Sequence, residues 1–268
     1  YQKWGNDCVK RFNGIFAFVI WDAHKRELFL ARDHIGVKPL YYFWDGKRFI
    51  FSSEIKAILE HNVSRAMNQE AMNHYLRALY VPEPLTMFQH IKKLPPASRA
   101  VLKDGQLKID TYWRLEHGNY ITTDLKETAV DLRGKISKAV ERQLVSDRPL
   151  GIYLSGGIDS SIVLDCVAEK RDNIDTFSVG FDLENGEDRE KFNQDFHLAR
   201  KTAAYYGTAH HEVLLSEQDV LDNLEKAIWH LDEPISNPTL LAMMKLAGFA
   251  KKSATVVGEV MGKYHPHG

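Results

Sequence analysis

The stretch YLSGGIDSS, residues 153–161, holds the residue types and spacing that most clearly indicate chemistry. Glycines let a backbone leave a strand in a tight turn with amide N–H groups free to point inward, and serine hydroxyls add donors. A helix that follows directly presents its positively polarised N-terminal end to the same space. The stretch therefore predicts a phosphate cradle built from Ser155, Gly156, Gly157, Ser160 and Ser161. It matches neither the Walker A loop, which ends in Gly-Lys-Ser/Thr, nor the G-x-G-x-x-G fingerprint.

The aspartate in this stretch needs an explanation of its own. Asp159 would repel a bare polyphosphate, so its carboxylate is expected to ligate a magnesium ion that bridges the phosphates. The alternative is that residues 155–161 only cap a helix, since Asp and Ser are preferred N-cap residues. Both interpretations stay open at this point.

Other reactive side chains are weaker candidates. The two cysteines, Cys8 and Cys166, are too few for a disulfide framework or a zinc ribbon, which favours a reducing compartment. Cys166 has apolar neighbours in a helix and is expected in a core. His210 and His211 are adjacent on an expected strand and point to opposite faces, which argues against a shared metal site.

The elements around the loop follow an alternating order. From Leu150 onward, strand and helix patterns alternate, which predicts a parallel sheet with crossover helices and places the loop at the carboxyl end of a strand, where ligands bind in such sheets. The expected strands are LGIYL, DTFSVGF, HHEVLL and ATVV. The expected helices lie at about 124–145, 158–170, 190–206, 217–229 and 238–251.

The first part of the chain is predicted as antiparallel β structure. Short aromatic and β-branched runs separated by turn residues predict a meander of strands at 14–22, 27–33, 40–45 and 48–53. Helices are expected from Ser53 and from Asn68. Four prolines and a weak hairpin pattern mark residues 82–113. We therefore predict a boundary between two domains near residues 82–123.

Composition excludes several classes of partner. Among the 268 residues, 35 Lys and Arg balance 36 Asp and Glu, so no basic field attracts nucleic acid or an anionic membrane. No apolar run approaches the roughly 20 residues that span a bilayer, and the first residues lack a signal-peptide pattern. We expect a cytoplasmic protein with no nucleic-acid or membrane partner.

Several motifs resemble one family. SGGIDS resembles the pyrophosphate loop of the ATP pyrophosphatases, which cleave ATP between the α- and β-phosphates and transfer AMP to a carbonyl or carboxylate oxygen. NGIFAFVIWD, LFLARDHIGVKPLYY and FSSEIKAIL look like the later part of the glutaminase domain of glutamine-hydrolysing asparagine synthetases. YVPEPLTMFQHIKKLPPAS resembles the linker of that family, and SVGF, ARKTAAYYGTAHHEVLL and LDEPISNP resemble its second domain.

The resemblance implies a fold and a domain arrangement. It implies an α/β chain, with the C-terminal part of an Ntn-type antiparallel β glutaminase domain at 1–100 and a linker to about 123. A Rossmann-like parallel α/β ATP pyrophosphatase domain at 124–268 would follow it.

It also implies a reaction. Aspartate, ATP and glutamine or ammonia would give asparagine, AMP and pyrophosphate through β-aspartyl-AMP. The reaction would require ATP and Mg²⁺. The assembly that the resemblance suggests is a homodimer. Leu154 and Val179 would contact adenosine, and Asp159 would bind Mg²⁺. Gly258 and Glu259 would be the remnant of a second nucleotide motif. Asp232, Glu233 and Pro234 would either line the aspartate pocket or end a helix.

The chain departs from the family's sequence pattern in two places. The family's N-terminal cysteine and its S-G-E-G-x-D-E motif do not appear in the chain, and Cys8 is internal, so no glutaminase nucleophile is expected here. We expect a fragment that cannot hydrolyse glutamine, that binds magnesium-ATP weakly and that turns over slowly or not at all. The alternatives are a related amidotransferase, of the β-lactam synthetase or surface-polysaccharide type, and a non-catalytic nucleotide-binding remnant.

Overall fold

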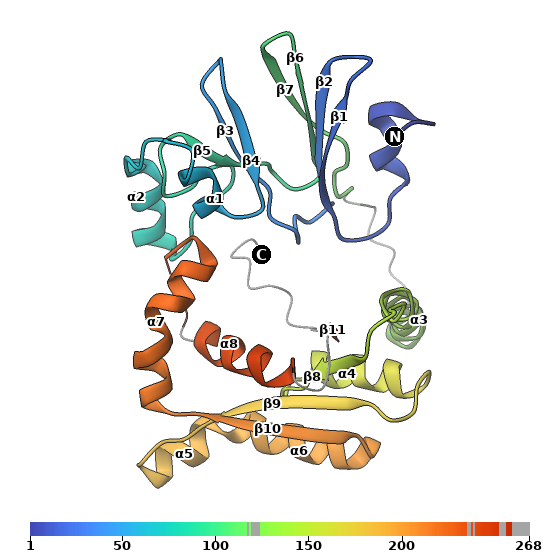
Figure 1. Ribbon diagram of the computed structural model, residues 1–268. Coiled ribbons are helices and arrows are strands. Elements are labelled where there is room, and N and C mark those ends of the chain that lie inside the picture. Colours follow the sequence, from blue (N-terminus) through green and yellow to red (C-terminus); the bar gives the residue numbers. More distant parts are fainter. Residues whose placement is uncertain (117, 119–123, 235–236, 238, 252–255, 259–268) are drawn as a thin grey trace. The chain divides into compact units, whose positions relative to one another are not determined.

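The computed structural model describes residues 1–116, 118, 124–234, 237, 239–251 and 256–258, and these form two compact units (Figure 1). The first unit consists of the described residues up to 118 together with residues 232–234. The second consists of residues 124–231 and the described residues from 237 to 258. Each unit is described separately below.

Two antiparallel sheets form the first unit, in the strand orders β1-β2-β6-β7 and β4-β3-β5. The first sheet contains β1 (Ala17–Asp22), β2 (Glu27–Arg32), β6 (Ser98–Lys103) and β7 (Gln106–Thr111). The second contains β3 (Tyr41–Trp44), β4 (Phe49–Ser52) and β5 (Ile91–Lys93). The expected single meander is wrong, because β2 pairs with β6 and β3 with β5, so the first two hairpins belong to different sheets.

Three short helices accompany these sheets: η1 (Gly5–Arg11, a 3-10 helix), α1 (Ile55–Leu59) and α2 (Gln69–Ala78). The expected cap of α2 is confirmed, since the Asn68 side chain accepts a hydrogen bond from the Ala71 N–H at 3.2 Å. The helix ends at Leu79 in the left-handed conformation. The core of this unit is built from Ile55, Ile58 and Ile91 beneath the second sheet and from Val9 and Phe29 beside the first.

The second unit contains a four-stranded parallel sheet in the order β10-β9-β8-β11. The strands are β8 (Leu150–Tyr153), β9 (Asp175–Phe181), β10 (Ala209–Leu215) and β11 (Val256–Gly258). The helices are α3 (Leu125–Gln143), α4 (Ile158–Ala168), α5 (Gly186–Phe192), α6 (Gln194–Tyr206), α7 (Glu217–Leu231) and α8 (Thr239–Ala250). The predicted parallel sheet with crossover helices is confirmed.

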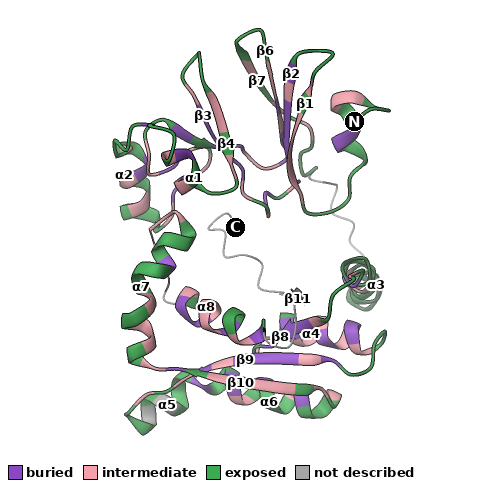
Figure 2. Ribbon diagram, in the orientation of Figure 1, coloured by how far each residue is buried: buried purple, intermediate pink, exposed green. Residues whose placement is uncertain are grey.

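Helices cover both faces of this sheet. α6 and α8 each pack against β9 and β10, and Figure 1 shows them on opposite faces. Because it is covered on both sides, β9 is more buried than β8 and β10, with Phe177 only 1% exposed (Figure 2). Leu154, Leu164 and Ala199 belong to one core cluster of this unit.

One expected helix is interrupted. A single helix was predicted over residues 190–206, but α5 and α6 are separate, with Asn193 between them. The Asn193 side chain is buried and bonds both backbone groups of Phe181, accepting from its N–H at 2.7 Å and donating to its C=O at 2.8 Å. The break therefore ties the start of α6 to the carboxyl end of β9.

In the described part of the chain, no helix combines the length and the apolarity that crossing a bilayer requires.

Candidate nucleotide site

The loop predicted to hold phosphate lies between β8 and α4. β8 ends at Tyr153, and α4 begins at Ile158 with Gly157 as its N-cap residue, so the turn lies at the carboxyl end of an interior strand of the sheet. No side chain caps the helix. The helix-cap interpretation therefore does not account for Asp159, which is the second residue of α4.

The loop serines hold the turn closed. Ser155 Oγ accepts the Gly157 N–H at 3.2 Å and lies 2.9 Å from Ser160 Oγ. Ser160 Oγ also lies 3.0 Å from the Ser155 carbonyl oxygen, and the Ser161 hydroxyl donates to the Gly157 carbonyl oxygen at 2.9 Å. Since these hydroxyls bond within the loop, donation to an anion falls mainly to backbone N–H groups of the first helical turn, which lack partners inside the helix.

Gly156 is required by close packing. A Cβ atom at this position would lie 2.6 Å from both Cα and the carbonyl oxygen of Asp195 and 2.8 Å from Cβ of Leu198. Since Asp195 and Leu198 are in α6, the loop rests against the first turns of that helix. Only glycine fits without moving backbone.

The Asp159 carboxylate is exposed and makes no hydrogen bond or ion pair to another described residue. Nowhere in the described part of the chain do three His, Cys, Asp or Glu side chains gather as a metal site. Mg²⁺ is commonly held by one or two carboxylates together with substrate phosphates and waters. A single available carboxylate beside a phosphate cradle fits that mode of binding.

Of the residues predicted to contact adenosine, Leu154 directly follows β8 and Val179 lies in the neighbouring strand β9. Leu154 is 3% exposed, its N–H donates to the Phe177 carbonyl oxygen at 2.8 Å, and its carbonyl oxygen accepts the Ser178 hydroxyl. Val179 is half-buried in β9 and is paired in register with Val213. Their contact with adenosine stays a prediction.

The predicted second nucleotide segment is described only in part. β11 pairs in parallel with β8, with Gly258 opposite Ile152, so Gly258 lies beside the strand that leads into the loop. Glu259 lies outside the described residues.

The adjacent histidines have separate partners. His210 Nδ1 lies 2.9 Å from Thr176 Oγ1, and His211 Nε2 lies 2.8 Å from Asp175 Oδ1. Burial lowers the pKa of His210, with Glu212 opposing the shift. The two side chains therefore contact different neighbouring residues.

Both cysteines are buried. Cys166 is 2% exposed, which confirms its predicted place in a core, and burial raises the pKa of its thiol. Cys8 is 1% exposed and packs with Val9 and Phe29.

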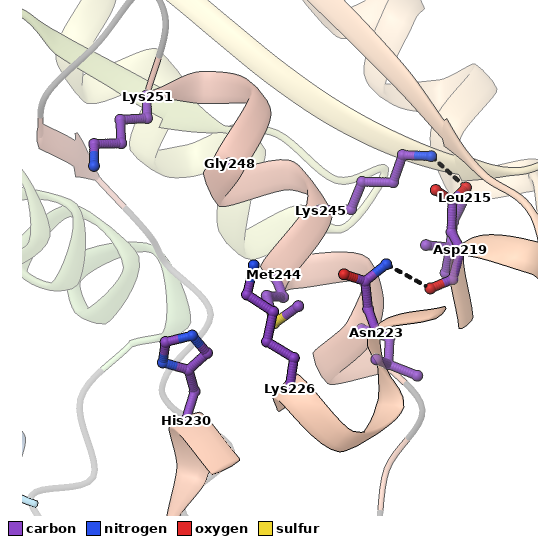
Figure 3. A pocket seen from close by; sticks show the side chains of 10 residues that line it. Leu215, Asp219, Asn223, Lys226, His230, Met244, Lys245, Gly248 and Lys251 are labelled. Carbon is purple, nitrogen blue, oxygen red and sulfur yellow. Dashed lines mark hydrogen bonds and ion pairs between the residues drawn. The ribbon is translucent and has the colours of Figure 1, made fainter. Parts of the chain in front are cut away.

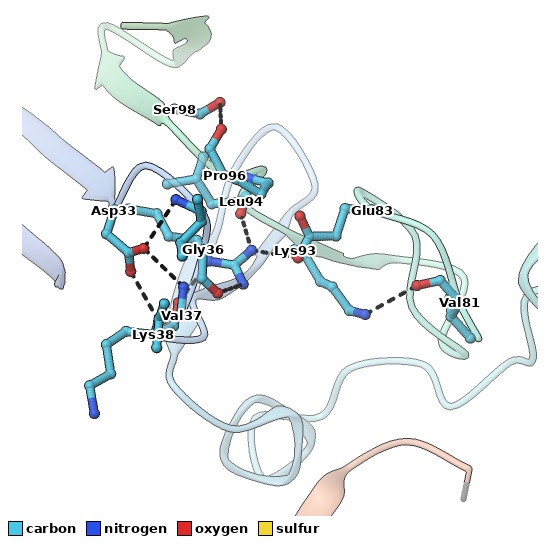
Figure 4. A network of polar contacts seen from close by, with 12 residues as sticks. Asp33, Gly36, Val37, Lys38, Val81, Glu83, Lys93, Leu94, Pro96 and Ser98 are labelled. Carbon is cyan, nitrogen blue, oxygen red and sulfur yellow. Dashed lines mark hydrogen bonds and ion pairs between the residues drawn. The ribbon is translucent and has the colours of Figure 1, made fainter. Parts of the chain in front are cut away.

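The motif ARDHIGVKPLYY, which joins two of the predicted strands, forms a polar network in the first unit (Figure 4). Asp33 accepts the N–H groups of Val37 at 2.9 Å and Lys38 at 3.0 Å. The buried Arg32 guanidinium bonds Glu83 Oε1 at 2.7 Å and three backbone carbonyl oxygens. The network fixes the turn. Two of the partners of Arg32, Glu83 and Leu94, lie 51 and 62 residues away in the sequence, too far for pattern reasoning to find.

Residues 232–234 belong to the first unit. α7 ends at Leu231, and Asp232 follows in the left-handed conformation, which agrees with the helix-end interpretation. The Asp232 carboxylate accepts the N–H of Ile55 at 2.7 Å and the N–H of Lys56 at 3.2 Å, and thereby caps α1. Glu233 Oε1 lies 2.6 Å from the buried Lys93 Nζ. Among the described residues, both carboxylates therefore contact partners within the first unit, Asp232 at the start of α1 and Glu233 at Lys93.

Comparison with known proteins supplies the family. The family model described as glutamine amidotransferase domain matches residues 1–113, and the family model described as asparagine synthase matches residues 131–258. A putative asparagine synthetase [glutamine-hydrolyzing] 2 of Methanocaldococcus jannaschii is 34% identical, over 100% of this chain and 53% of the relative. The chain belongs to the glutamine-hydrolysing asparagine synthetase family.

Other asparagine synthetases agree with this placement. Asparagine synthetase [glutamine-hydrolyzing] 1 of Bacillus subtilis is 31% identical over 96% of this chain and 39% of its own length. Asparagine synthetase [glutamine-hydrolyzing] 3 of the same organism is 34% identical over 87% and 40%. The chain thus spans between 39% and 53% of these asparagine synthetases. The predicted order, an antiparallel β half followed by a parallel α/β half, is confirmed.

Proposed function

We propose that the second unit activates aspartate with ATP, as the first step of glutamine-dependent asparagine formation. The observation that carries the proposal is the loop of residues 154–157, which leads from an interior parallel strand into α4 and leaves the Asp159 carboxylate unpaired among the described residues. This is the arrangement that a pyrophosphate leaving group requires, with backbone donors for its oxygens and one carboxylate for its metal.

In the proposed reaction, an oxygen of the aspartate β-carboxylate attacks the α-phosphorus of ATP. The bond between that phosphorus and the bridging oxygen breaks, pyrophosphate leaves, and β-aspartyl-AMP forms. The N–H groups at the start of α4 hold the pyrophosphate oxygens as charge develops on them. Asp159 would hold Mg²⁺, and the chemistry that the ion would supply is neutralisation of charge on the leaving group. Ammonia then attacks the β-carbonyl carbon, loses a proton and expels AMP.

The source of ammonia is also a proposal. The amidotransferase match of the first unit supports glutamine as the nitrogen donor, through hydrolysis of its side-chain amide. Free ammonia would bypass that step.

The test is aspartate-dependent exchange of labelled pyrophosphate into ATP. Asp159→Asn is expected to reduce exchange by about 10²- to 10³-fold, since losing one electrostatic partner in a preorganised site typically has that effect. Asp172→Asn removes an exposed carboxylate in the turn after α4 and is expected to leave exchange unchanged.

Each of three experimental outcomes would contradict the proposal. Exchange that requires a different carboxylic acid would favour a related amidotransferase. Magnesium-ATP binding that Asp159→Asn weakens, without exchange for any acid, would favour a nucleotide-binding remnant. Binding and exchange that are both indifferent to Asp159→Asn would remove the loop from the site.

A further inference from the structure

A pocket lies in the second unit, between α7 and α8 and beside the end of β10 (Figure 3). It is open to solvent along the exposed residues Lys226, His230, Gly248 and Lys251, and its volume of about 440 Å³ is within the range of pockets that hold small metabolites. It shares no residue with the loop that follows β8. β9 separates β8 from β10, and Tyr153 at the end of β8 is level with His211, four residues before the end of β10. The ends of the two strands are therefore roughly 16 Å apart.

The lining comes from one stripe of each helix. α7 contributes Asp219, Asn223, Lys226 and His230, and α8 with the residue after it contributes Leu241, Met244, Lys245, Gly248 and Lys251. These spacings place each set on a single helical face. The stripe of α7 that lines the pocket is wholly polar, whereas its apolar residues Leu221 and Ile228 are exposed. A helix that packs against another usually buries an apolar stripe between them. The polar stripe of α7 therefore requires an explanation.

The charges of the lining do not cancel. Lys245 pairs with Asp219, which also accepts the Ser216 N–H at 2.8 Å and the Ser216 hydroxyl at 2.6 Å. Lys226 and Lys251 make no ion pair with any residue that the structure describes. Figure 3 shows these two lysines with His230 on one side of the pocket, while Lys245 turns toward Asp219 on the other. The one carboxylate among the described lining residues, that of Asp219, is paired with Lys245, so two positive charges face the space without a carboxylate of their own.

We propose that this pocket binds a small dicarboxylate with a short hydrocarbon body. Lys226 and Lys251 belong to different helices and would each pair with one carboxylate, which matches two separated charges better than one compact anion. Leu215, Leu241 and Met244 offer an apolar surface for the methylene groups between them. An α-amino group would face lysines, so aspartate fits this pocket less well than a dicarboxylate without an amine. The proposal does not rest on the nucleotide site.

The test uses succinate and succinamate, which match in size and differ by one negative charge. Binding is followed by isotope-edited NMR of the whole chain, with amide shifts expected at Asn223, Lys226 and Gly248. Succinate is expected to bind at least about fivefold more tightly than succinamate or aspartate, and the difference is expected to shrink in high salt.

Lys226→Gln and Lys251→Gln are each expected to weaken succinate binding about fivefold or more. Lys201→Gln, which removes an exposed lysine from α6 on the opposite face of the sheet, is expected to change nothing. The amide spectra of the variants show whether each remains folded.

Equal binding of succinate and succinamate, or binding that neither lysine substitution weakens, would overturn the proposal. Tighter binding of inorganic phosphate than of succinate would overturn the dicarboxylate assignment. Because Asp159→Asn is expected to leave succinate binding intact, failure here and failure of the nucleotide site are distinguishable.

Discussion

At the scale of single residues, Gly156 provides the sharpest test of the phosphate loop. Gly156→Ala would put a methyl group 2.6 Å from backbone atoms of Asp195, so the loop must move away from α6. We expect a loss of about 1–3 kcal/mol in the free energy of unfolding and weaker binding of magnesium-ATP. Urea unfolding and a nucleotide titration measure the two effects.

Gly134→Ala is the matched control. Gly134 lies inside α3, and nothing lies within 4 Å of its missing Cβ, so the same substitution is expected to stabilise the protein by about 0.5–1 kcal/mol. If both alanine variants behaved alike, the close approach of the loop to α6 would be refuted.

His210 gives the second unit a dependence on pH. Burial lowers the pKa of its imidazole in the folded protein below the ordinary value of 6.5, so the unfolded chain binds the proton more readily. The stability linked to neutral His210 is therefore complete above about pH 6.5 and is lost as the pH falls through the folded-state pKa. We expect His210→Gln to lose less stability than the wild type between pH 7 and pH 5, measured by urea unfolding followed by circular dichroism.

The exposed His24 in the turn after β1 is the control for removing one imidazole. If His24→Gln and His210→Gln reduced the loss of stability between pH 7 and pH 5 equally, the assignment to His210 would be contradicted.

Residue types predicted much of the candidate site. Two glycines and an aspartate between apolar runs were enough to place the loop, since few other functions require free N–H groups beside a carboxylate. The packing of Gly156 on Asp195 could not be predicted, because α6 meets the loop only in three dimensions. The bonds of Ser160 to Ser155 and Gly157 are local, but they depend on the backbone conformation of the turn, which residue types do not fix.

At the scale of elements, the junction between α5 and α6 is the feature that the sequence conceals. Helical periodicity runs through residues 190–206, and it cannot show that Asn193 leaves the helix to bond the backbone of Phe181. The same limit explains the two sheets of the first unit. Apolar alternation identified the strands, but the pairing of β2 with β6 and of β3 with β5 depends on segments about 70 and 50 residues away.

Asn193→Ala is expected to destabilise the second unit by about 1–3 kcal/mol, since it removes the buried side chain that bonds both backbone groups of the half-buried Phe181. Hydrogen exchange at the Phe181 amide reports the effect directly and should accelerate. The neighbouring Gln194 is exposed, and Gln194→Ala is expected to leave that exchange rate unchanged. An unaltered rate in Asn193→Ala would show that the junction is held by something else.

At the scale of the whole molecule, one residue late in the chain stabilises a helix near its beginning. Asp232→Ala removes the acceptor for two N–H groups of α1 and places alanine in a left-handed conformation, so we expect the first unit to lose about 1–3 kcal/mol. Tryptophan fluorescence reports mainly on this unit. Four of the five tryptophans lie there: Trp4, Trp21, Trp44 and Trp113.

Asp232→Asn keeps an acceptor oxygen and tolerates the left-handed conformation, so it is expected to lose less stability than the alanine variant. If the two variants unfolded at the same urea concentration, the cap would contribute nothing measurable.

The order of strands in the parallel sheet also bears on how the protein is made. β8, which carries the phosphate loop, gains its second neighbour only when β11 pairs with it, and β11 follows about 100 residues later. At the usual pace of translation, that interval lasts roughly 5–20 seconds. Throughout it, one edge of LGIY presents unpaired N–H and C=O groups to the crowded cytosol around a ribosome. Nascent chains arrested before Val256 should therefore recruit chaperones or aggregate more readily than chains arrested beyond it.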